Sequence, residues 1–402
     1  MQSVESYREE IIAAITPLPP EDLAIAGADG AVLAEDVRAA WPLPGFDNSA
    51  MDGYAVIAAD VATASPDHPV RLPVEAEVAA GDTTACSLAA GRCIKIMTGA
   101  RLPDGADAVV PVEWTDGGNE IVAVTQPASK GHAIRLAGDD ARPGDLLLMA
   151  GTRLGAAQIG VLAAAGHGTV RARRRPRVTV ISTGNELAEP GSPLVPGLIW
   201  DSNSYMLAAA ARQAGCEVTR YPTQRDEPEA VLAAIEHAAA TADLLITSGG
   251  VSMGGEHDVV KAALTKLGTV TFRKVAMQPG MPQGFGLLGA RSTPIFTLPG
   301  NPVSAFVSFR VFVEPAVRVL QNIQGQRAVP RRARLTGPTT SPEGRQSFLR
   351  GILDSEAGAV TPLTGQSSHQ IASLARANAL IIVPEAVTEF PAGEVVDVLE
   401  LP

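Results

Sequence analysis

The sequence contains little cysteine, little histidine and few aromatic residues. Its 402 residues include three cysteines and six histidines, and Phe, Trp and Tyr together make up 4% of the chain. The cysteines, at positions 86, 93 and 216, form no CxxC pair and are odd in number, which argues against a disulfide framework and against a zinc site. No HExxH pair is present either. These absences disfavour a zinc enzyme and a disulfide-stapled secreted protein, and they favour a reducing compartment.

Long apolar runs are also missing. No stretch approaches the about 20 consecutive apolar residues that a membrane-spanning helix needs. The N-terminal segment has no apolar signal core, and it places apolar residues at helical spacing with charged residues between them: Val4, Tyr7, Ile11 and Ile15. We therefore expect an amphipathic helix here, a cytoplasmic protein and no membrane partner.

Acidic residues outnumber basic ones, which limits the partners that the protein can have. There are 43 Asp and Glu residues against 32 Lys and Arg, a formal net charge of −11, so a nucleic-acid partner is not expected. The basic run 171–177, RARRRPR, is short and lacks aromatic residues, and we interpret it as a solvated segment at the start of a domain. An anionic ligand would need a local cation or fixed backbone dipoles, which makes a divalent metal a candidate.

The length predicts several domains, because a single hydrophobic core stops growing at about 250 to 300 residues. The 39 glycines and 31 prolines predict many turns. We expect four regions: an elongated linker domain of residues 1–44 plus 145–172, a small β-rich domain of 45–144, an α/β domain of 173–325, and a C-terminal β domain of 326–402.

From residue 178 onward, apolar strands alternate with helical patterns. Segments 178–183 and 243–248 predict strands, and helices are expected near 203–214, 227–241 and 258–267. This alternation is the βαβ signature of a mostly parallel sheet covered by helices on both faces. The predicted fold class is therefore a three-layer α/β domain combined with β-rich domains.

Acidic residues follow three strands of the predicted sheet. Glu186 follows the first strand, Asp226 the second and Asp258 the third. Ligands of open α/β sheets bind beyond the carboxyl ends of the strands, so we expect the three carboxylates to share one rim. The third loop adds small residues that let backbone amides approach an anion: Ser248, Gly249, Gly250, Ser252 and Gly254.

Carboxylates beside a phosphate cradle would repel the ligand unless a cation lies between them, and Mg²⁺ suits carboxylate and phosphate oxygens. Lys274 in a following strand could offset charge on phosphoryl oxygens. The alternative is that the three acids are only helix caps. The sequence has no Walker loop, no GxGxxG turn and no GxSxG elbow, which disfavours a P-loop enzyme, a hydride-transfer enzyme and a serine hydrolase.

Several motifs are specific enough to suggest a family. The sequence resembles the MoeA family, the molybdopterin molybdotransferases, which includes the E domain of gephyrin. The most specific matches are DNSAMDGYAV (47–56) and LPGNPVS (298–304). Shorter matches run in order along the chain: IMTGA (96–100), RLAGDD (135–140), STGNEL (182–187), IWDSN (199–203), SGGVSMG (248–254), QPGMP (278–282), FLRG (348–351) and SSH (367–369).

The resemblance implies an activity and an assembly. Members insert molybdate into adenylylated molybdopterin, release AMP and require Mg²⁺. They are elongated homodimers in which a MogA-like α/β domain of one subunit and the small β domain of the other form the active cleft. Possible acceptors of the product are molybdoenzymes or their chaperones.

The resemblance also implies site residues. Asp258 with Glu186 or Asp226 would hold Mg²⁺, and the glycine-rich loop would cradle phosphate and AMP. Molybdate would lie among Arg350, Ser368, Ser304 and the nearby Lys274. The remaining implied positions are in the small β domain. Asp52, Thr98 and Asp140 would close the cleft from the partner subunit, and Arg135 would bind the substrate.

Two positions depart from the family pattern. Gln278 and Met281 stand where many members carry lysines, so two positive charges are missing beside an oxyanion site. Weaker molybdate affinity, a paralogue with reduced activity and a non-catalytic pterin-binding scaffold are the alternatives that follow. A related pyrophosphate-cleaving or nucleotidyl-transferring enzyme is a further alternative, which product analysis would distinguish.

Overall fold

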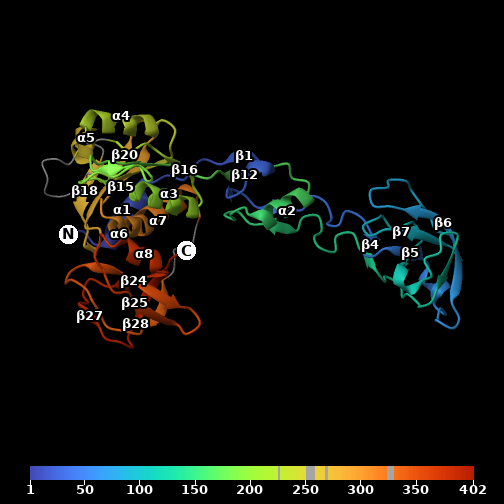
Figure 1. The fold of residues 1–402 in the computed structure, drawn as a ribbon. Helices are drawn as coiled ribbons and strands as arrows, with labels where there is room; N and C mark the ends of the chain where they lie inside the picture. The colour runs from blue at the N-terminus through green and yellow to red at the C-terminus, as the bar shows by residue number, and fades with distance from the viewer. Residues whose placement is uncertain (225–226, 250–258, 268–269, 324–329) are drawn as a thin grey trace.

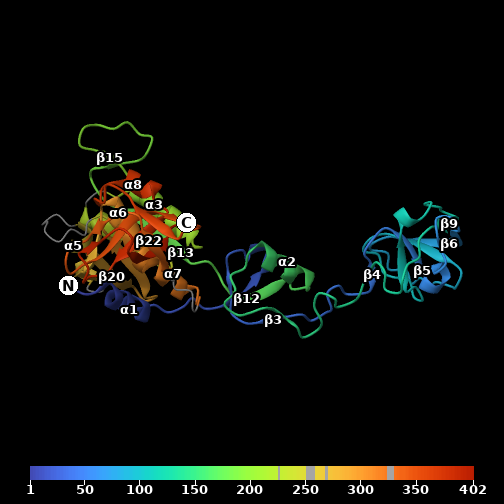
Figure 2. The same cartoon turned by 90° about the horizontal axis from the view of Figure 1, so that it is seen from below.

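The protein is elongated, with its regions arranged along one axis (Figures 1 and 2). The structure, a computed structural model, describes residues 1–224, 227–249, 259–267, 270–323 and 330–402. An α/β region and a C-terminal β region lie together at one end, a small β region lies at the other, and a narrow linker joins them. Within the described residues, no helix is both long and apolar enough to cross a bilayer.

A six-stranded sheet forms the centre of the α/β region, in the order β16-β13-β17-β21-β20-β18. The first four strands are parallel neighbours, and β20 is antiparallel to both β21 and β18. The strands in that order are Glu217–Arg220, Arg177–Ser182, Leu244–Ser248, Thr293–Leu298, Pro282–Leu288 and Val270–Lys274. The predicted mostly parallel sheet is confirmed.

The sequence pattern did not predict β20. Gly284 and Gly286 interrupt its apolar run. A Cβ atom at Gly284 would lie 1.9 Å from Thr297 Oγ1 on the neighbouring strand, so close packing requires glycine there. Because close packing requires glycine at position 284, the sequence of this segment lacks the pattern of large apolar residues that predicts a strand.

Helices cover both faces of the sheet, as predicted: α3 (Asn203–Gln213), α4 (Pro228–Ala239) and α5 (Val259–Leu267). Alternate residues of β17 enter different cores. Leu244 and Ile246 belong to a cluster that includes residues of α3, whereas Leu245 belongs to a cluster that includes residues of α4 and α5. The strand therefore has two buried faces, and its sequence is a continuous apolar run.

The N-terminal helix α1 (Val4–Ala14) packs in the α/β region, whereas the expected boundaries placed residues 1–44 in the linker. The ring of Tyr7 meets the ring of Phe312 edge to face, with centroids 5.0 Å apart. Ile11 is fully buried in the same cluster. An amphipathic helix buries its apolar stripe where a large apolar surface exists, and the linker cluster is small by comparison.

A nearly continuous helix follows residue 302, as predicted. It comprises α6 (Pro302–Ser308), the π-helical turn η4 (Phe309–Val313) and α7 (Glu314–Leu320). Next comes the C-terminal sheet, in which β24 pairs with both β25 and β26, so that the sheet closes into a barrel. Its members are β19 (Met277–Gln278), β22 (Arg331–Leu335), β24 (Gln346–Asp354), β25 (Ala359–Pro362), β26 (Ala379–Val383) and β28 (Val395–Glu400), and the short helix α8 (Ile371–Arg376) lies beside them.

Two further sheets belong to the small β region and to the linker. The small β region has a five-stranded sheet in the order β8-β5-β7-β6-β9: Ala108–Pro111, Gly53–Val56, Cys93–Ile96, Val70–Val78 and Ile121–Val124. Its paired strands β4 (Asn48–Ser49) and β10 (Ile134–Arg135) lie beside it. The linker contains the sheet β1-β12-β2 and the helix α2: Glu21–Ala24, Thr169–Arg173, Val32–Leu33 and Ala156–Ala164.

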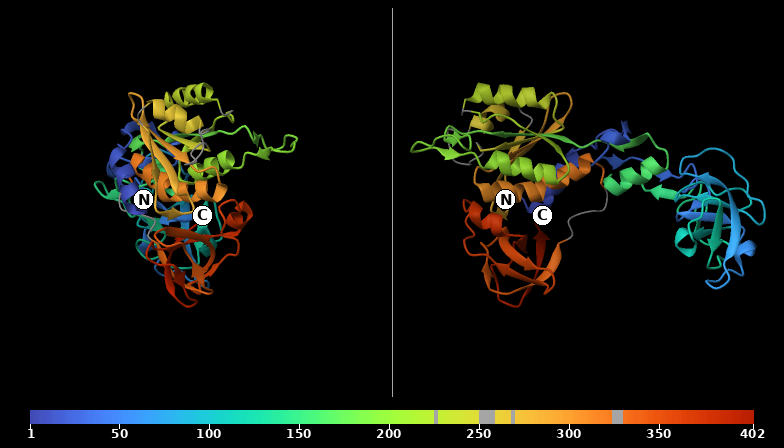
Figure 3. Two further views of the ribbon diagram at one scale, coloured as in Figure 1. Left: turned by 90° about the vertical axis from the view of Figure 1, so that its left-hand side faces the viewer. Right: turned by 45° about the vertical axis from the view of Figure 1, so that its right-hand side comes forward.

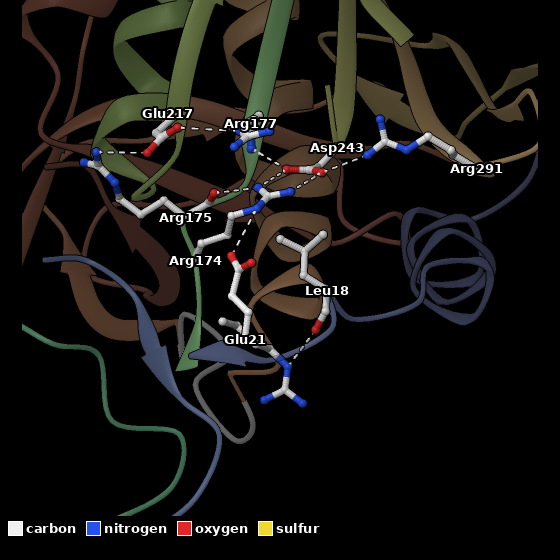
Figure 4. Close-up of polar contacts among 9 residues, drawn as sticks. Leu18, Glu21, Arg174, Arg175, Arg177, Glu217, Asp243 and Arg291 are labelled. Atoms are coloured by element: carbon white, nitrogen blue, oxygen red, sulfur yellow. Dashed lines mark hydrogen bonds and ion pairs between the residues drawn. The ribbon is translucent and has the colours of Figure 1, made fainter. Parts of the chain in front are cut away.

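The basic run 171–177 is tied down by ion pairs, which corrects its interpretation as a solvated segment (Figure 4). The guanidinium of Arg174 donates from Nη1 and Nη2 to the two carboxylate oxygens of Asp243, over 2.5 and 2.9 Å. The Asp243 side chain is 2% exposed, and it also accepts from the backbone N–H of Arg177. The run thus anchors the linker strand β12 to the α/β sheet, a long-range pairing that local sequence does not reveal.

We expect Asp243→Asn to destabilise the α/β region by about 2–4 kcal/mol, because it leaves the partly buried guanidinium of Arg174 with the longer 3.6 Å pair to the exposed Glu21 as its remaining contact with a carboxylate. Urea denaturation followed by circular dichroism would measure the change. The control is Glu217→Gln, whose side chain is 50% exposed and pairs with Arg175 over 3.4 Å, and which should cost under ~1 kcal/mol. Equal effects of the two substitutions would contradict this account.

Candidate active site

The carboxyl ends of three parallel strands meet through backbone contacts. After β13, Thr183 N–H donates to the carbonyl of Ser248 at the end of β17, over 3.2 Å. Gly184 N–H donates to the carbonyl of Gln224, which follows β16, also over 3.2 Å. The loops that follow these strands therefore start side by side at one edge of the sheet.

Gly249 shows how close this approach is. Its φ is +97°, and a Cβ atom there would lie 2.6 Å from the carbonyl oxygen of Thr183. Only glycine tolerates both conditions. The first residues of the predicted glycine-rich loop, Ser248 and Gly249, thus lie against the first strand-end loop, while Gly250, Ser252 and Gly254 lie outside the described residues.

Of the three predicted acids, the structure describes Glu186. Its side chain is exposed, and its carboxylate lies over Gly184, where an added Cβ atom would be 2.7 Å from Oε2. Asp226 and Asp258 lie outside the described residues, so the convergence of the three carboxylates stays a prediction. Among the described residues, His, Cys, Asp and Glu form no group of three or more that could hold a metal ion.

Two polar residues near this edge received no role from sequence reasoning, although both lie in the matched run IWDSN. Asp201 is 1% exposed, and Asn203 donates hydrogen bonds to Ser248 and to Gly300. Their position at the start of α3 is typical of helix caps, so their long-range contacts have no signal in a single sequence.

Arg350 in β24 is a fully buried guanidinium without a carboxylate partner among the described residues. Its Nε–H donates to Ser373 Oγ over 3.0 Å, and Nη2 donates to the carbonyls of Gly365 and Ser367 over 2.5 and 3.2 Å. The remaining nitrogen, Nη1, is buried and has no hydrogen-bond partner in the described part of the chain. Burial lowers the pKa of this guanidinium from its usual value.

The loop that holds Arg350 rests on the start of α6, where two predicted serines lie. Ser368 Oγ accepts from Asn301 Nδ2 over 3.0 Å, and the Ser368 carbonyl accepts from Val303 N–H over 3.0 Å. Ser304, 4% exposed, lies in the first turn of α6. Arg350, Ser368 and Ser304 therefore gather where the C-terminal barrel meets the α/β region.

The segment with the two departures from the family pattern joins the same two regions. Lys274 is exposed at the end of β18, and the following strand β19 pairs with β24 of the barrel. The amide oxygen of Gln278 accepts from Arg345 Nη1 over 3.2 Å. A guanidinium therefore contacts the position at which many family members carry a lysine.

The remaining predicted residues lie in the small β region. This region is at the opposite end of the molecule from the α/β and C-terminal regions that carry Glu186 and Arg350 (Figures 1 and 3). One carboxylate oxygen of Asp52 accepts from both the hydroxyl and the N–H of Thr98, each over 2.7 Å. These bonds, the hydroxyl first, lower the pKa of the Asp52 carboxyl. Arg135 in β10 and Asp140 beyond it are exposed on the same region. Within one chain, the predicted residues of the small β region therefore lie apart from those at the strand ends of the α/β sheet.

Comparison with protein families matches almost the whole chain in three parts. Residues 2–166 match the MoeA N-terminal region (domains I and II). Residues 179–319 match a probable molybdopterin binding domain, and residues 332–401 match the MoeA C-terminal region (domain IV).

Individual relatives agree along their full length. Molybdopterin molybdenumtransferase 2 of Mycobacterium tuberculosis (strain H37Rv) is 45% identical over 100% of both chains. Molybdopterin molybdenumtransferase 1 of the same strain is 41% identical over 99% of this chain and 98% of its own. The crystal structure of a molybdopterin biosynthesis MoeA protein from Pyrococcus horikosii has a TM-score of 0.76 at 33% identity, covering 99% of this chain and 98% of that one. The resemblance seen in the sequence motifs is confirmed, and the chain belongs to the MoeA family.

Proposed function

We propose that the protein is a molybdopterin molybdenumtransferase that inserts molybdate into adenylylated molybdopterin, with Mg²⁺-dependent release of AMP. The full-length relatives named molybdopterin molybdenumtransferase support the transferase activity. The match on both sides of the α/β region argues against an enzyme that only cleaves pyrophosphates on a related domain.

The buried guanidinium of Arg350 is the observation that carries the proposal. An arginine side chain stays cationic at neutral pH, and a buried charge without a counter-ion costs several kcal/mol. A bound anion would offset this cost and give Nη1 an acceptor. Molybdate is a tetrahedral dianion with oxygen acceptors on every side. Ser368, which follows the Ser367 carbonyl bound by Arg350, and Ser304, in the first turn of α6, would supply additional hydroxyl donors. We assign the molybdate site to these three residues, with Lys274 nearby.

The strand-end edge suits the pyrophosphate of the other substrate. Ser248 and Gly249, with Gly250, Ser252 and Gly254 beyond them, would cradle the phosphates and AMP. The carboxylate of Glu186, with those of Asp226 and Asp258, is the oxygen donor set that Mg²⁺ prefers. A bound Mg²⁺ would neutralise charge on the phosphate oxygens. The chain's own residues would align the pyrophosphate with molybdate.

A second copy of the chain completes the site in this proposal. Asp52, Thr98, Arg135 and Asp140 lie too far along the elongated molecule to reach the strand-end edge of their own chain (Figure 1). We propose a homodimer in which the small β region of one copy closes the cleft of the other. We place the dimer in the cytoplasm, where molybdoenzymes or their chaperones would accept the product.

The direct test is molybdate-dependent AMP release from adenylylated molybdopterin, with and without Mg²⁺. We expect AMP and molybdenum cofactor to form together and chelation of Mg²⁺ to stop both. AMP release that is independent of molybdate, with no cofactor formed, would indicate a pyrophosphate-cleaving enzyme. Binding of the pterin without AMP release would indicate a scaffold.

We expect Arg350→Gln to weaken molybdate binding by roughly 10²-fold, because the charge-assisted hydrogen bonds of a buried cation are lost. Isothermal titration with molybdate would measure the change, and thermal unfolding would show that the barrel remains folded. Arg334→Gln is the matched control, because Arg334 is an exposed arginine of the same barrel whose guanidinium donates to Gly393 O. Unchanged molybdate affinity in folded Arg350→Gln would refute the assignment.

Thr98→Val should raise the pKa of Asp52 toward its ordinary value, because the substitution removes the hydroxyl that contributes most to the lowered pKa. A carboxyl with a lowered pKa favours folding above its unfolded-state pKa, and that contribution is lost as the pH falls through the folded-state pKa. The variant should therefore lose the ionised form of Asp52 at a higher pH. NMR titration of the Asp52 carboxyl carbon checks this, and Thr98→Ser, which keeps a hydroxyl, should behave like the parent protein.

A further inference from the structure

We infer that Asp201 and Asn203 are positioning residues that fix the spacing of four strand ends at the active-site edge. We call these two residues the strand-end brace. The inference rests on the proposed function, because the loops that the brace holds are those assigned above to the phosphates and Mg²⁺. Neither residue needs to touch the substrate for this role.

Asp201 connects three elements through its buried carboxylate. Oδ1 accepts from the hydroxyl of Ser182, the last residue of β13, over 3.1 Å, and from the N–H of Ser204 over 3.0 Å. Oδ2 accepts from the hydroxyl of Ser204 over 2.6 Å and from that of Thr223, beyond β16, over 3.3 Å. The carboxylate therefore holds the ends of β13 and β16 against the start of α3.

Asn203 extends the connection to the next two strands. Its Nδ2 donates to the hydroxyl of Ser248, the last residue of β17, over 2.8 Å. The same nitrogen donates to the carbonyl of Gly300, just beyond β21, over 2.7 Å. The two brace residues together contact the ends of β16, β13, β17 and β21, which are neighbours in the sheet.

The charge of Asp201 makes a purely structural explanation insufficient. Among the described residues, its four hydrogen-bond donors are neutral, and no Lys or Arg lies within ion-pairing distance of its carboxylate. The Asp201 carboxylate is one of the charges that raise the pKa of Arg220, so a cation lies near it, but its direct contacts are hydrogen bonds from neutral donors, which offset the cost of burying the charge. Its distinctive property is that it holds donors from separate elements in one fixed geometry.

The brace also reaches the loop that carries Glu186. The backbone N–H of Asp201 donates to the carbonyl of Ala188 over 2.9 Å, and Ile199 N–H donates to the carbonyl of Glu186 over 2.8 Å. The long excursion between these two contacts projects from the body of the molecule (Figures 2 and 3). Glu186 is thus held at the base of this projection by the segment that leads into Asp201.

A second layer of contacts supports the base of the projection. Arg220 donates to the hydroxyl of Ser204 over 3.3 Å, and its guanidinium lies over the ring of Tyr205, 4.0 Å from the ring centre. The same guanidinium forms an ion pair with Glu189 at the start of the projection, and the Tyr205 hydroxyl donates a hydrogen bond to the Glu189 carboxylate. The first layer fixes the strand ends, and this layer fixes the projection relative to them.

The close approach of Gly249 to Thr183 explains why spacing matters. With a backbone contact this tight, a small shift of one strand end moves the glycine-rich loop relative to Glu186. A misplacement of about 1 Å can reduce catalysis by roughly 10²-fold. We therefore expect loss of the Asp201 carboxylate to act on phosphate and Mg²⁺ binding more strongly than on molybdate binding, because its contacts reach β13, β16 and α3 and not the start of α6, on which the loop that holds Arg350 rests.

The test compares Asp201→Asn and Asn203→Ala with Ser202→Ala in the dimeric full-length protein. Ser202 lies between the two brace residues, is exposed and makes no capping hydrogen bond with its side chain. The probe is AMP in the presence of Mg²⁺, titrated calorimetrically, with inorganic molybdate titrated separately. We expect each brace variant to weaken AMP binding by roughly 10-fold or more. Asp201→Asn should change molybdate affinity less than about threefold, and Ser202→Ala should change neither affinity.

Ser182→Ala, which removes one of the four donors to Asp201, should give an intermediate loss and keeps the test informative if Asp201→Asn fails to fold. Equal weakening of AMP and molybdate binding by Asp201→Asn, or a lowered melting temperature with unchanged AMP affinity, would overturn the inference and leave Asp201 as a structural residue. The binding readouts require no turnover. Absence of AMP release in the parent protein would therefore refute the proposed function without deciding the role of the brace.

Discussion

Four parallel strands end at one edge of the α/β sheet, and this constraint positions everything that we assign to the pyrophosphate. Parallel strands present their carboxyl ends together, so residues far apart in the sequence become neighbours without any local signal. The contacts of Thr183 with Ser248 and of Gly184 with Gln224 show that the loops begin in register. The site therefore depends first on how accurately the strand ends are spaced.

Electrostatics sets the second constraint, because the proposed function requires an acidic chain to bind anions. With a net charge of −11, the long-range field repels molybdate and phosphates alike. Binding must come from short-range contacts at sites with local positive charge. Arg350 supplies one positive charge, which its burial holds in place. Arg345, in contact with Gln278, supplies a second positive charge near the position where the family pattern has a lysine. A guanidinium approaching from the barrel can thus compensate part of the charge missing from the segment 278–282, which weakens the argument that Gln278 indicates a scaffold.

Sequence reasoning predicted the elements whose signals are local. The apolar runs of β13 and β17 and the helices α1, α3, α4 and α5 follow from periodicity, because burial on one or two faces leaves a regular pattern. It missed β20, where packing against Thr297 demands Gly284, and α8, which is too short to show a period. It also misread Arg174, whose partner Asp243 lies on the far side of two helices in the sequence. The roles of Asp201 and Asn203 were invisible for the same reason, since each looks like a cap until the sheet brings its distant partners together.

The elongated shape supports the proposed dimer, because it keeps the small β region of one chain away from the α/β region of the same chain (Figure 1). The Asp52–Thr98 pair is exposed, and the small β region that carries it lies at the opposite end of the molecule from the C-terminal barrel that carries Arg350 (Figure 1). A carboxylate whose ionised form is favoured by two hydrogen bonds is prepared for a cation or a polar ligand. The small β region has its own core, and both of these hydrogen bonds come from Thr98 of the same region. If the pair acts in the transfer reaction, it does so on a ligand held by another copy. The cleft would then form only where two copies of the chain meet, and each part of the site would rest on its own hydrophobic core.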